Sequence, residues 1–320
     1  MCESYTVERF AEQEGLLPLK KNLKEWIGTV WGEKDFLFIG ATGIAVRMIA
    51  PWVKDKFTDS AVLVLDEKAE FVIPLLSGHM GGGVELAHVI ASCTGAVPVI
   101  TTATDVQGHF AVDVFAKKNQ LCIGNRVLAK QISAAVLEGK KIGFYSEYPV
   151  KGNLPEELEL CNCTEDLDKY EWGIAVAAKR VESEKILSLI PQNLVVGIGC
   201  RKGVVMEQIQ EQLEDIFQKK SWDNARISML VSIDLKKEEP GLVELARKYG
   251  VPFQTYPAED LKKIETVSDS SAFVESVTGV DNVCERAAIK CCPKGELLLP
   301  KRKLDQVTVA VVERKVEITF

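Results

Sequence analysis

Short apolar segments alternate with amphipathic segments along most of the chain. Residues 36–39, 61–65 and 70–78 contain nearly continuous apolar runs, which are typical of strands buried on both faces. Residues 82–95 follow with apolar positions at helical spacing and end at a glycine, a residue type that commonly ends helices. A fourth apolar run lies within 96–105 and ends in polar residues. Buried strands that alternate with helices predict a parallel sheet with helices on both faces.

The same alternation starts again near Pro191 and continues to the end of the chain. Strands are predicted within residues 193–203, 225–236, 251–257 and, as a pair, 295–314. Helices are predicted within residues 204–220, 240–250 and 281–292. The second of these helices has a proline near its start and a glycine at its end, which is the order that helix termini favour.

The region between these two halves has a less regular pattern. A helix within 125–141 and a short strand within 142–147 are predicted, whereas residues 147–170 are rich in Pro, Gly, Asn and acids and are expected to form exposed loops. The predicted fold class is therefore α/β, with two Rossmann-like domains of mostly parallel sheets joined by a less regular middle region. The expected boundaries are 1–118 for the N-terminal domain, 119–190 for the middle linking region and 191–320 for the C-terminal domain.

Composition and charge exclude several classes of function. The chain has 320 residues, 47% of them hydrophobic, and a net charge of −7, which argues against nonspecific binding to nucleic acid or acidic membranes. No apolar run approaches the roughly 20 residues that a membrane span needs. The first residues lack the basic and apolar regions of a signal peptide, so a cytoplasmic protein with reduced cysteines is expected.

Two cysteine pairs could suggest a metal site. Cys161 and Cys163 form a CxC pair, and Cys291 is adjacent to Cys292. Neither arrangement is the CxxC pair that is typical of zinc sites, so buried or surface thiols are the favoured interpretation.

The three histidines, His79, His88 and His109, lie within one segment. A three-histidine metal site is one interpretation, but His88 follows His79 at a distance that does not align the two on one face of a helix. His79 follows Ser77-Gly78 in a strand-to-helix loop, where a histidine can act as acid or base near neutral pH. A loop histidine that hydrogen-bonds to the backbone is the alternative. Asp105 could be a base or a helix cap.

Polar and glycine-rich sequences follow four of the predicted strands. In a parallel sheet the carboxyl ends of the strands face helix N-termini and form the usual ligand crevice. The four sequences are Gly40-Ala41-Thr42-Gly43, Ser77-Gly78-His79 with three glycines behind it, Thr101-Thr102-Ala103-Thr104-Asp105, and Gly197 to Gly203. Glycines let backbone amides approach a ligand, and a helix N-terminus favours an anion. Generic tight turns explain the same glycines equally well.

Neither glycine-rich turn is a standard nucleotide fingerprint. Residues 197–203 read GxGxxxG, one residue longer than the dinucleotide pattern, and residues 40–43 are too few for it. A nucleotide-dependent oxidoreductase is therefore a weak alternative. Arg47, Lys236 and the run 301–303 (Lys-Arg-Lys) could bind carboxylates, although this run could also be the solvated edge of a strand.

Several of these segments closely resemble the CbiG family, the cobalt-precorrin-5A hydrolases of anaerobic cobalamin synthesis. The segments are FIGATGIAVRMIAPWVKDKFTDSAVLVLDE, VIPLLSGHMGG and PVITTATD in the first half, and VVGIGCRKG, SIDLKKEEPGLVELA, TGVDNVCERAAI and LLLPKRK in the second. The resemblance runs from about Asp35 to the C-terminus and is weaker over 120–190. Gly83-Val84 departs from the Ala-Asn that ends the family's SGHxGGAN pattern. The resemblance also implies that the N-terminal domain lacks a first strand and helix upstream of Cys2.

The resemblance implies chemistry on a cobalt-bearing tetrapyrrole. The family opens the δ-lactone between the ring A acetate and the meso carbon that joins rings A and D, and this carbon leaves with its methyl as acetaldehyde. The substrate carries the cobalt, so no cofactor and no protein-bound metal are expected. Transient contact with other enzymes of the pathway and a homodimer are further expectations.

The resemblance also assigns roles to residues. Lactone opening needs a base and donors for a developing oxyanion. The catalytic candidates are His79 as base, Asp105 as an orienting group and Glu85. The candidates for substrate binding are Gly40, Thr42, Gly43, Arg47, Ser77, Gly78, Gly81, Gly82, Thr101, Thr102, Gly197, Gly199, Arg201, Lys202, Gly203 and Lys236. A noncatalytic tetrapyrrole-binding protein of the same pathway is the alternative function.

Overall fold

The chain divides into two compact units, which we describe separately. The computed structural model describes residues 2–19, 22–55, 58–78, 81–101, 109–264 and 277–320. The N-terminal unit is Met1–Val114 and the C-terminal unit is Phe115–Phe320. Their boundary falls inside helix α6 (Val112–Lys118), whose last residue ends the predicted N-terminal domain. The predicted site residues His79, Thr102 and Asp105 lie outside the described residues.

The N-terminal unit contains a four-stranded sheet in the order β3-β4-β5-β6. Its strands are β3 (Phe36–Ile39), β4 (Val62–Leu65), β5 (Phe71–Leu76) and β6 (Val97–Pro98). Its helices are α2 (Leu23–Val30), α3 (Thr42–Ile49) and α4 (Gly83–Thr94). The preceding residues form a small parallel pair, β1 (Tyr5–Thr6) and β2 (Leu17–Pro18), around α1 (Glu8–Glu14).

The sheet of the N-terminal unit is mixed rather than parallel. β3 and β4 are parallel, as are β5 and β6, but β4 and β5 are antiparallel. Residues 66–70 alone connect β4 to β5, whereas a parallel connection needs a dozen or more residues. Asp66 stabilises this turn, because its carboxylate accepts the Phe71 N–H at 2.5 Å and the Lys68 N–H at 2.9 Å. The sheet is thus mostly parallel, as predicted, and the antiparallel β4–β5 pair is the exception.

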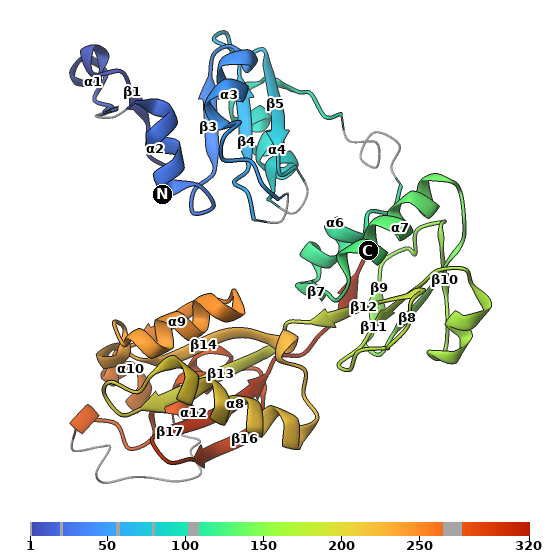
Figure 1. The fold of residues 1–320 in the computed structure, drawn as a ribbon, viewed down its shortest axis with the longest axis vertical. Helices are drawn as coiled ribbons and strands as arrows, with labels where there is room; N and C mark the ends of the chain where they lie inside the picture. Colours follow the sequence, from blue (N-terminus) through green and yellow to red (C-terminus); the bar gives the residue numbers. More distant parts are fainter. Residues whose placement is uncertain (1, 20–21, 56–57, 79–80, 102–108, 265–276) are drawn as a thin grey trace. The chain divides into compact units, whose positions relative to one another are not determined.

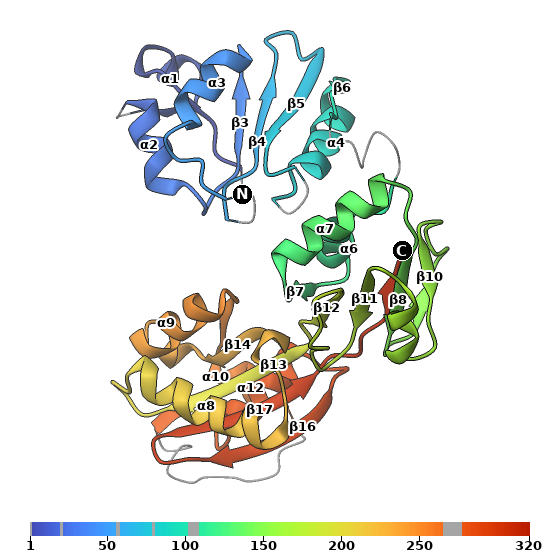
Figure 2. The same cartoon turned by 45° about the vertical axis from the view of Figure 1, so that its right-hand side comes forward.

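Helices cover both faces of this sheet, as the apolar pattern predicted (Figure 2). On one face, Ile27 of α2 and Ile49 of α3 pack on Phe36 and Val62 of the strands. On the other face, Ala87 of α4 packs against a second set of strand residues, Leu63, Leu65 and Val72. Successive side chains of a strand point to opposite faces of the sheet, so the same strands contribute apolar residues to both cores.

The first part of the C-terminal unit forms a second α/β domain, which we call the middle domain. Its five-stranded sheet has the order β10-β8-β11-β12-β7. The strands are β7 (Leu121–Ile123), β8 (Ile142–Ser146), β10 (Leu158–Leu160), β11 (Gly173–Val176) and β12 (Ile186–Pro191). Helix α7 (Arg126–Leu137) begins at Asn125, whose side chain accepts the N–H groups of Val127 and Leu128. The short helix η1 (Glu165–Lys169) lies between β10 and β11.

The middle domain is more regular than the sequence predicted. Within residues 147–170, expected as loops, β10 pairs with β8, and β9 (Val150–Lys151) pairs with β18 (Ile318–Thr319). The end of the chain therefore returns to the middle domain, although residues 191–320 were predicted as one C-terminal domain. Phe320 stacks on Phe115 with ring centroids 4.8 Å apart. This contact extends the aromatic core of the middle domain.

The remaining residues form the C-terminal domain, built on a five-stranded sheet in the order β15-β14-β13-β17-β16. Its strands are β13 (Leu194–Cys200), β14 (Ile227–Ile233), β15 (Phe253–Tyr256), β16 (Glu296–Lys303) and β17 (Val307–Glu313). Its helices are α8 (Met206–Lys220), α9 (Pro240–Tyr249), α10 (Ala258–Lys262) and α12 (Val283–Cys291), with short turns η2 (Asn224–Arg226) and η3 (Asp234–Lys236). These positions confirm the predicted order of strands and helices.

Both faces of this sheet are covered as well (Figure 1). Helices α8 and α9 pack on one face, where Leu213, Phe217 and Leu245 are buried. Helices α10 and α12 pack on the other, where Leu261 and Ala287 are buried. Among the described helices, none combines the length and apolar character that a membrane-spanning segment requires.

Candidate functional site

The mixed sheet separates the predicted site residues of the N-terminal unit. The register places Ile39, at the end of β3, level with Leu65 and Val72, whereas Leu76 at the end of β5 is level with Val62 and the start of β3. The two loops therefore leave opposite edges of the sheet, about 10 Å apart along strands that rise about 3.3 Å per residue. The prediction that all these loops of the N-terminal unit line one crevice is therefore wrong.

The loop after β5 is a closed backbone turn. The Gly83 and Val84 N–H groups, in the first turn of α4, donate to the carbonyls of Ser77 at 3.1 Å and Gly78 at 2.9 Å. Ser77 is buried, and its hydroxyl donates to the carbonyl of Asp59 at 2.9 Å. These bonds satisfy two N–H groups that a helix start would otherwise leave free. Ser77 and Gly78 therefore hold the loop that contains His79.

Gly81 and Gly82 have different reasons to be glycine. A Cβ at Gly81 would lie 2.4 Å from the Ser77 Cβ, so no other residue fits. Gly82 has φ +81°, a left-handed conformation that glycine adopts without penalty. Among the described residues, neither amide has a backbone acceptor. Glu85, in the first turn of α4, and Thr101, after β6, are both exposed.

The loop after β3 belongs to the opposite edge. Gly40 has φ +136°, and its N–H donates to the Leu65 carbonyl at 2.9 Å. Thr42 is the first residue of α3. The Arg47 guanidinium, one turn further along, donates to the Gly43 carbonyl at 3.1 Å and is exposed to solvent. These residues form a second exposed helix start, distinct from the loop after β5.

In the C-terminal domain, Gly197 and Gly199 allow close packing within the protein itself. A Cβ at Gly197 would lie 1.9 Å from the Cys284 carbonyl oxygen, and one at Gly199 would lie 2.6 Å from the Thr308 hydroxyl. Helix α12 and strand β17 therefore occupy the space that a ligand would need at these two positions. The glycines bring the start of α12 to the carboxyl edge of β13.

The three residues after β13, Arg201, Lys202 and Gly203, form an exposed loop. Gly203 has φ +81°, and its N–H donates to Glu239 at 2.7 Å. The other carboxylate oxygen of Glu239 accepts from Lys236 at 2.7 Å, and the two side chains are 6% and 14% exposed. Lys236 was predicted to bind substrate, but here its charge is paired inside the domain.

This environment sets the protonation of Glu239. Burial acts to raise the pKa of the carboxyl, but the Lys236 ammonium and the Gly203 N–H outweigh it, so the pKa lies below its ordinary value. Glu239 is therefore an anion at neutral pH. Glu239 is not among the predicted site residues, although its place just before Pro240, at the start of α9, marks it as a helix N-cap residue.

A second basic segment reaches the same edge of the sheet. β16 and β13 both pair antiparallel with β17, so they run in the same direction; Lys303 pairs with Thr308, which also pairs with Gly199. We call the residues that these two segments contribute the basic rim: Arg201, Lys202, Lys301, Arg302 and Lys303. Among the described residues, no ion pair involves Arg201, Lys202, Arg302 or Lys303.

Glu285 lies beneath the second segment and is fully buried. Its carboxylate accepts the Lys301 N–H at 2.8 Å, and its own N–H donates to the Asn282 side chain at the start of α12 at 3.3 Å. Sequence reasoning missed this residue. The available signal was a carboxylate in the stretch VCERAA, where the flanking residues other than the arginine are small, apolar and buried.

The cysteines and the remaining histidines give no metal cluster. Within the described ranges, no three His, Cys, Asp or Glu side chains gather as metal ligands. All nine cysteines are free thiols. Burial raises the pKa of Cys200, at the end of β13, and that of Cys284, in α12, to about 11 in each case. Both are therefore protonated and poorly nucleophilic at neutral pH.

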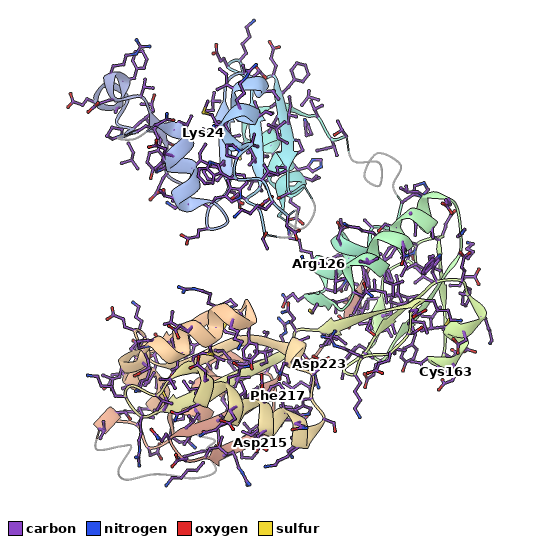
Figure 3. The ribbon with its side chains drawn as sticks, in the orientation of Figure 1. Lys24, Arg126, Cys163, Asp215, Phe217 and Asp223 are labelled. Atoms are coloured by element: carbon purple, nitrogen blue, oxygen red, sulfur yellow. The ribbon has the colours of Figure 1, made fainter. Side chains whose placement is uncertain are left out.

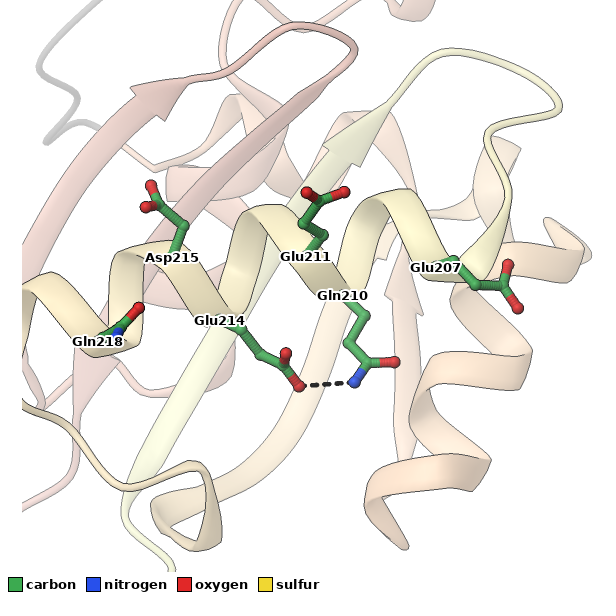
Figure 4. A pocket seen from close by; sticks show the side chains of 6 residues that line it. All are labelled: Glu207, Gln210, Glu211, Glu214, Asp215 and Gln218. Carbon is green, nitrogen blue, oxygen red and sulfur yellow. Dashed lines mark hydrogen bonds between the residues drawn. The ribbon is translucent and has the colours of Figure 1, made fainter.

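A hollow of about 390 Å³ lies along the solvent side of α8 (Figure 4). Its lining is acidic and amide-bearing: Glu207, Gln210, Glu211, Glu214, Asp215 and Gln218. The Gln210 amide donates to Glu214 at 2.6 Å. A surface of this charge repels a polycarboxylate, so the basic rim is the better candidate for binding one.

Three family models match consecutive parts of the chain. The model described as cobalamin synthesis G N-terminal matches residues 25–105, and cobalamin biosynthesis central region matches residues 110–191. Cobalamin synthesis G C-terminus matches residues 194–312. The middle region, the weakest part of the resemblance, is thus covered by a model of its own.

Two curated proteins are similar over most of the chain. Cobalt-precorrin-5A hydrolase of Salmonella typhimurium is 36% identical over 287 residues, which are 86% of this chain and 80% of that protein. Cobalt-precorrin-5A hydrolase of Priestia megaterium is 35% identical over 292 residues, 87% and 78% of the two chains. A crystal structure of a cobalamin biosynthesis protein G homolog from Sulfolobus solfataricus is 22% identical, with a TM-score of 0.41 over 97% of this chain and 95% of that one. The chain therefore belongs to the CbiG family of cobalamin-synthesis proteins.

Proposed function

We propose that this protein hydrolyses cobalt-precorrin-5A. The observation that carries the proposal is the 36% identity to the Salmonella enzyme of that name, which extends over 86% of this chain. In this reaction the ring A δ-lactone opens, and the meso carbon between rings A and D leaves with its methyl as acetaldehyde. The product is cobalt-precorrin-5B.

The loop after β5 is our candidate for the lactone chemistry. His79 would activate the attacking water and then take the proton of the released hydroxyl, with Asp105 orienting it and Glu85 as a further acid or base. The Gly81 and Gly82 amides, with Thr101 or Thr102, would donate to the developing oxyanion. Support comes from the closed turn at Ser77 and Gly78, which fixes both ends of the segment that carries the histidine.

We assign the peripheral carboxylates of the substrate to basic side chains. Arg201 and Lys202 are exposed on the loop after β13. Arginine can bind a carboxylate through two N–H groups, which gives orientation as well as charge. The cobalt enters with the tetrapyrrole, and the chemistry proposed here uses side chains and backbone amides alone. We place the enzyme in the cytoplasm, where its nine free thiols stay reduced.

Acetaldehyde release tests the proposed function. Purified full-length protein is incubated with cobalt-precorrin-5A, and acetaldehyde is measured through NADH oxidation by alcohol dehydrogenase. We expect stoichiometric release from the unmodified protein and a rate about 10²–10⁴ lower for His79→Ala, the usual contribution of a general base. His88→Ala is the matched control, since His88 is exposed on α4, and should keep the full rate.

Each negative result has a separate meaning. If the substrate binds but no acetaldehyde is released, the protein is a noncatalytic tetrapyrrole-binding protein and not a hydrolase. Full release from His79→Ala would retain the hydrolase but remove His79 as its base.

A further inference from the structure

The two segments of the basic rim are close enough to bind one ligand. Strand β17 alone separates β13 from β16, and neighbouring strands lie about 4.8 Å apart, so the two segments are about 10 Å apart across the sheet. Both end at the edge where the first turn of α12 begins. A tetrapyrrole with carboxylates around its periphery spans this distance.

Each segment is held from beneath by a buried glutamate. Glu239 accepts the N–H of Gly203 at 2.7 Å, and Glu285 accepts the N–H of Lys301 at 2.8 Å. Glu239 is 7% exposed and Glu285 is fully buried, so both are shielded from a ligand at the rim. In both places a carboxylate bonds to the backbone of a basic segment.

On charge alone, carboxylates would not be expected beneath a surface that binds anions. A negative charge beneath an anion-binding surface weakens the attraction for the anion. Burial of a carboxylate also costs free energy unless hydrogen bonds or a partner charge compensate for it. The backbone bonds at Gly203 and Lys301, together with the ion pair between Lys236 and Glu239, supply such compensation, and the backbone bonds fix the two segments at the same time.

We infer that Glu239 and Glu285 are positioning residues that preorganise the basic rim as a receptor for the peripheral carboxylates of a tetrapyrrole. The identity of that tetrapyrrole rests on the proposed function, whereas the receptor itself rests on these contacts. Preorganised donors bind more tightly because less conformational freedom is lost on binding. Arg201, Lys202, Arg302 and Lys303 make the contacts, and the glutamates act through them.

The test uses uroporphyrin, a stable tetrapyrrole with carboxylates around its ring, and measures its dissociation constant from the full-length protein by fluorescence. A positioning role and a purely electrostatic role predict opposite changes in uroporphyrin affinity when a glutamate is replaced by alanine. If the glutamates position the rim, Glu239→Ala and Glu285→Ala each weaken binding by about fivefold or more, although each removes a negative charge. If only charge matters, both variants bind more tightly.

Glutamine variants separate the hydrogen bond from the charge. Glu239→Gln and Glu285→Gln keep an oxygen that accepts the same N–H, so we expect them to bind at least as tightly as the unmodified protein. Arg201→Ala with Lys202→Ala, and Arg302→Ala with Lys303→Ala, should each weaken binding and reduce its salt dependence. Glu211→Ala, on the exposed face of α8, is the control for loss of a carboxylate and should bind no more weakly than the unmodified protein.

Tighter binding by the alanine variants, or equal weakening by the glutamine variants, would overturn the inference. Where an alanine variant does not fold, hydrogen exchange in the unmodified protein decides the matter. The Gly203 and Lys301 amides should be protected, and exchange of either at the rate of an unstructured chain contradicts the inference. The KM of acetaldehyde release should rise in the alanine variants while kcat changes little.

The two proposals fail in different ways. If no acetaldehyde is released but the variants bind uroporphyrin in the expected order, the proposed hydrolase function is wrong and the proposed carboxylate receptor stands. If acetaldehyde is released normally but the uroporphyrin affinities of the variants do not follow the expected order, only the positioning role of the glutamates is wrong.

Discussion

Ser77 combines backbone strain with a buried hydrogen bond. Its φ of +53° is left-handed, which is unfavourable for a residue with a Cβ, and its hydroxyl donates to the Asp59 carbonyl. Asp59 in turn accepts the indole N–H of Trp31 at 3.1 Å and the Lys54 N–H at 2.7 Å. The loop before α4 is thereby tied to the start of β4. Strain held in place next to a candidate catalytic residue is consistent with a site that keeps one geometry.

Substitution of Ser77 should separate these two effects. Ser77→Ala leaves the Asp59 carbonyl without its donor and keeps the strain, so we expect the free energy of unfolding to fall by about 1–2 kcal/mol. Ser77→Gly loses the same bond but relieves about 1 kcal/mol of left-handed strain, so it should be intermediate. Urea unfolding of the full-length protein measures the order. An alanine variant as stable as the glycine variant would contradict the assignment of strain.

Glycines show what a sequence can and cannot predict about a site. The absence of a Cβ was expected to let a ligand approach, and at Gly203 the space around the residue is indeed open. At Gly81 and Gly197 the protein's own atoms occupy that space. A glycine is needed in both cases, because a ligand and a neighbouring part of the protein can each approach the backbone closely only where there is no Cβ. Only the position of the neighbour distinguishes them.

Gly197→Ala should destabilise the C-terminal unit strongly. The new Cβ would lie 1.9 Å from the Cys284 carbonyl oxygen, which belongs to helix backbone and cannot rotate away. We expect a loss of about 3 kcal/mol in the free energy of unfolding. Gly139→Ala is the matched control, since Gly139 has φ +76° and open space around it, and should cost about 1 kcal/mol. Equal losses in the two variants would contradict the packing role.

At the scale of elements, the apolar pattern predicted the strands of the N-terminal sheet but neither their full burial nor their direction. β4 is buried throughout, whereas Ile39 of β3 and Phe71 of β5 are exposed. Residues 71–76 read as a buried strand whichever way they run, because direction does not change which side chains are covered. The five residues between β4 and β5 contained the missing information, since so short a connection joins antiparallel strands. Direction then decides which loops share an edge of the sheet. For this reason Gly40 and Ser77 were wrongly expected in one crevice.

The middle domain shows a second limit of the pattern. Its strands β9 and β10 contain two and three residues, which is too few for alternation or a continuous run to be recognised. Tertiary pairing forms them: β10 adds to β8, and β9 pairs with β18, more than 160 residues away in sequence. Nothing local in the sequence indicates a partner so distant.

The aromatic contact of β18 predicts that the last residue stabilises the middle domain. Phe320 stacks on Phe115 and meets Phe144 edge-on, with centroids 5.2 Å apart. Phe320→Ala should lower the free energy of unfolding by about 2 kcal/mol, because a half-buried aromatic ring is lost. Phe320→Leu retains apolar volume and should cost about half as much. Thermal unfolding that is unchanged in the alanine variant would show that the tail contributes nothing.

At the scale of the whole molecule, the two domains of the C-terminal unit are joined by more than the chain between β12 and β13. The Arg180 guanidinium of the middle domain donates to Asp223 of the C-terminal domain at 2.5 Å, and Asp223 lies where the two domains meet (Figure 3). Next to this link, within the C-terminal domain, the buried Arg226 bonds to Glu313 and, at 3.2 Å, to Asn193, the residue before β13. Apolar periodicity predicted the C-terminal domain, whereas residues 119–190 were expected to form only a less regular linking region. These polar bonds join residues far apart in sequence and could not be anticipated.

The link at Asp223 makes the stability of this unit depend on pH. Burial acts to raise the pKa of the Asp223 carboxyl, but Arg180 and the Ala225 N–H outweigh it, so the pKa lies below its ordinary value. The unfolded chain therefore binds the proton first as the pH falls. The stabilisation is complete above the ordinary value of about 3.9 and disappears as the pH falls through the lower, folded value. Arg180 is partly exposed, so salt should weaken the effect.

Asp223→Asn tests this linkage. The variant should be less stable than the unmodified protein at pH 7. In urea unfolding the difference should stay nearly complete at pH 4 and shrink at pH 3, because the aspartate of the unfolded chain is protonated first. Asn still accepts the Ala225 N–H, so the part that titrates is the interaction with Arg180. Asp305→Asn is the control, since Asp305 is exposed and has no ion pair among the described residues, and its difference should stay constant with pH. A difference at Asp223 that does not shrink would mean that the domains are held together at this point by packing and not by charge.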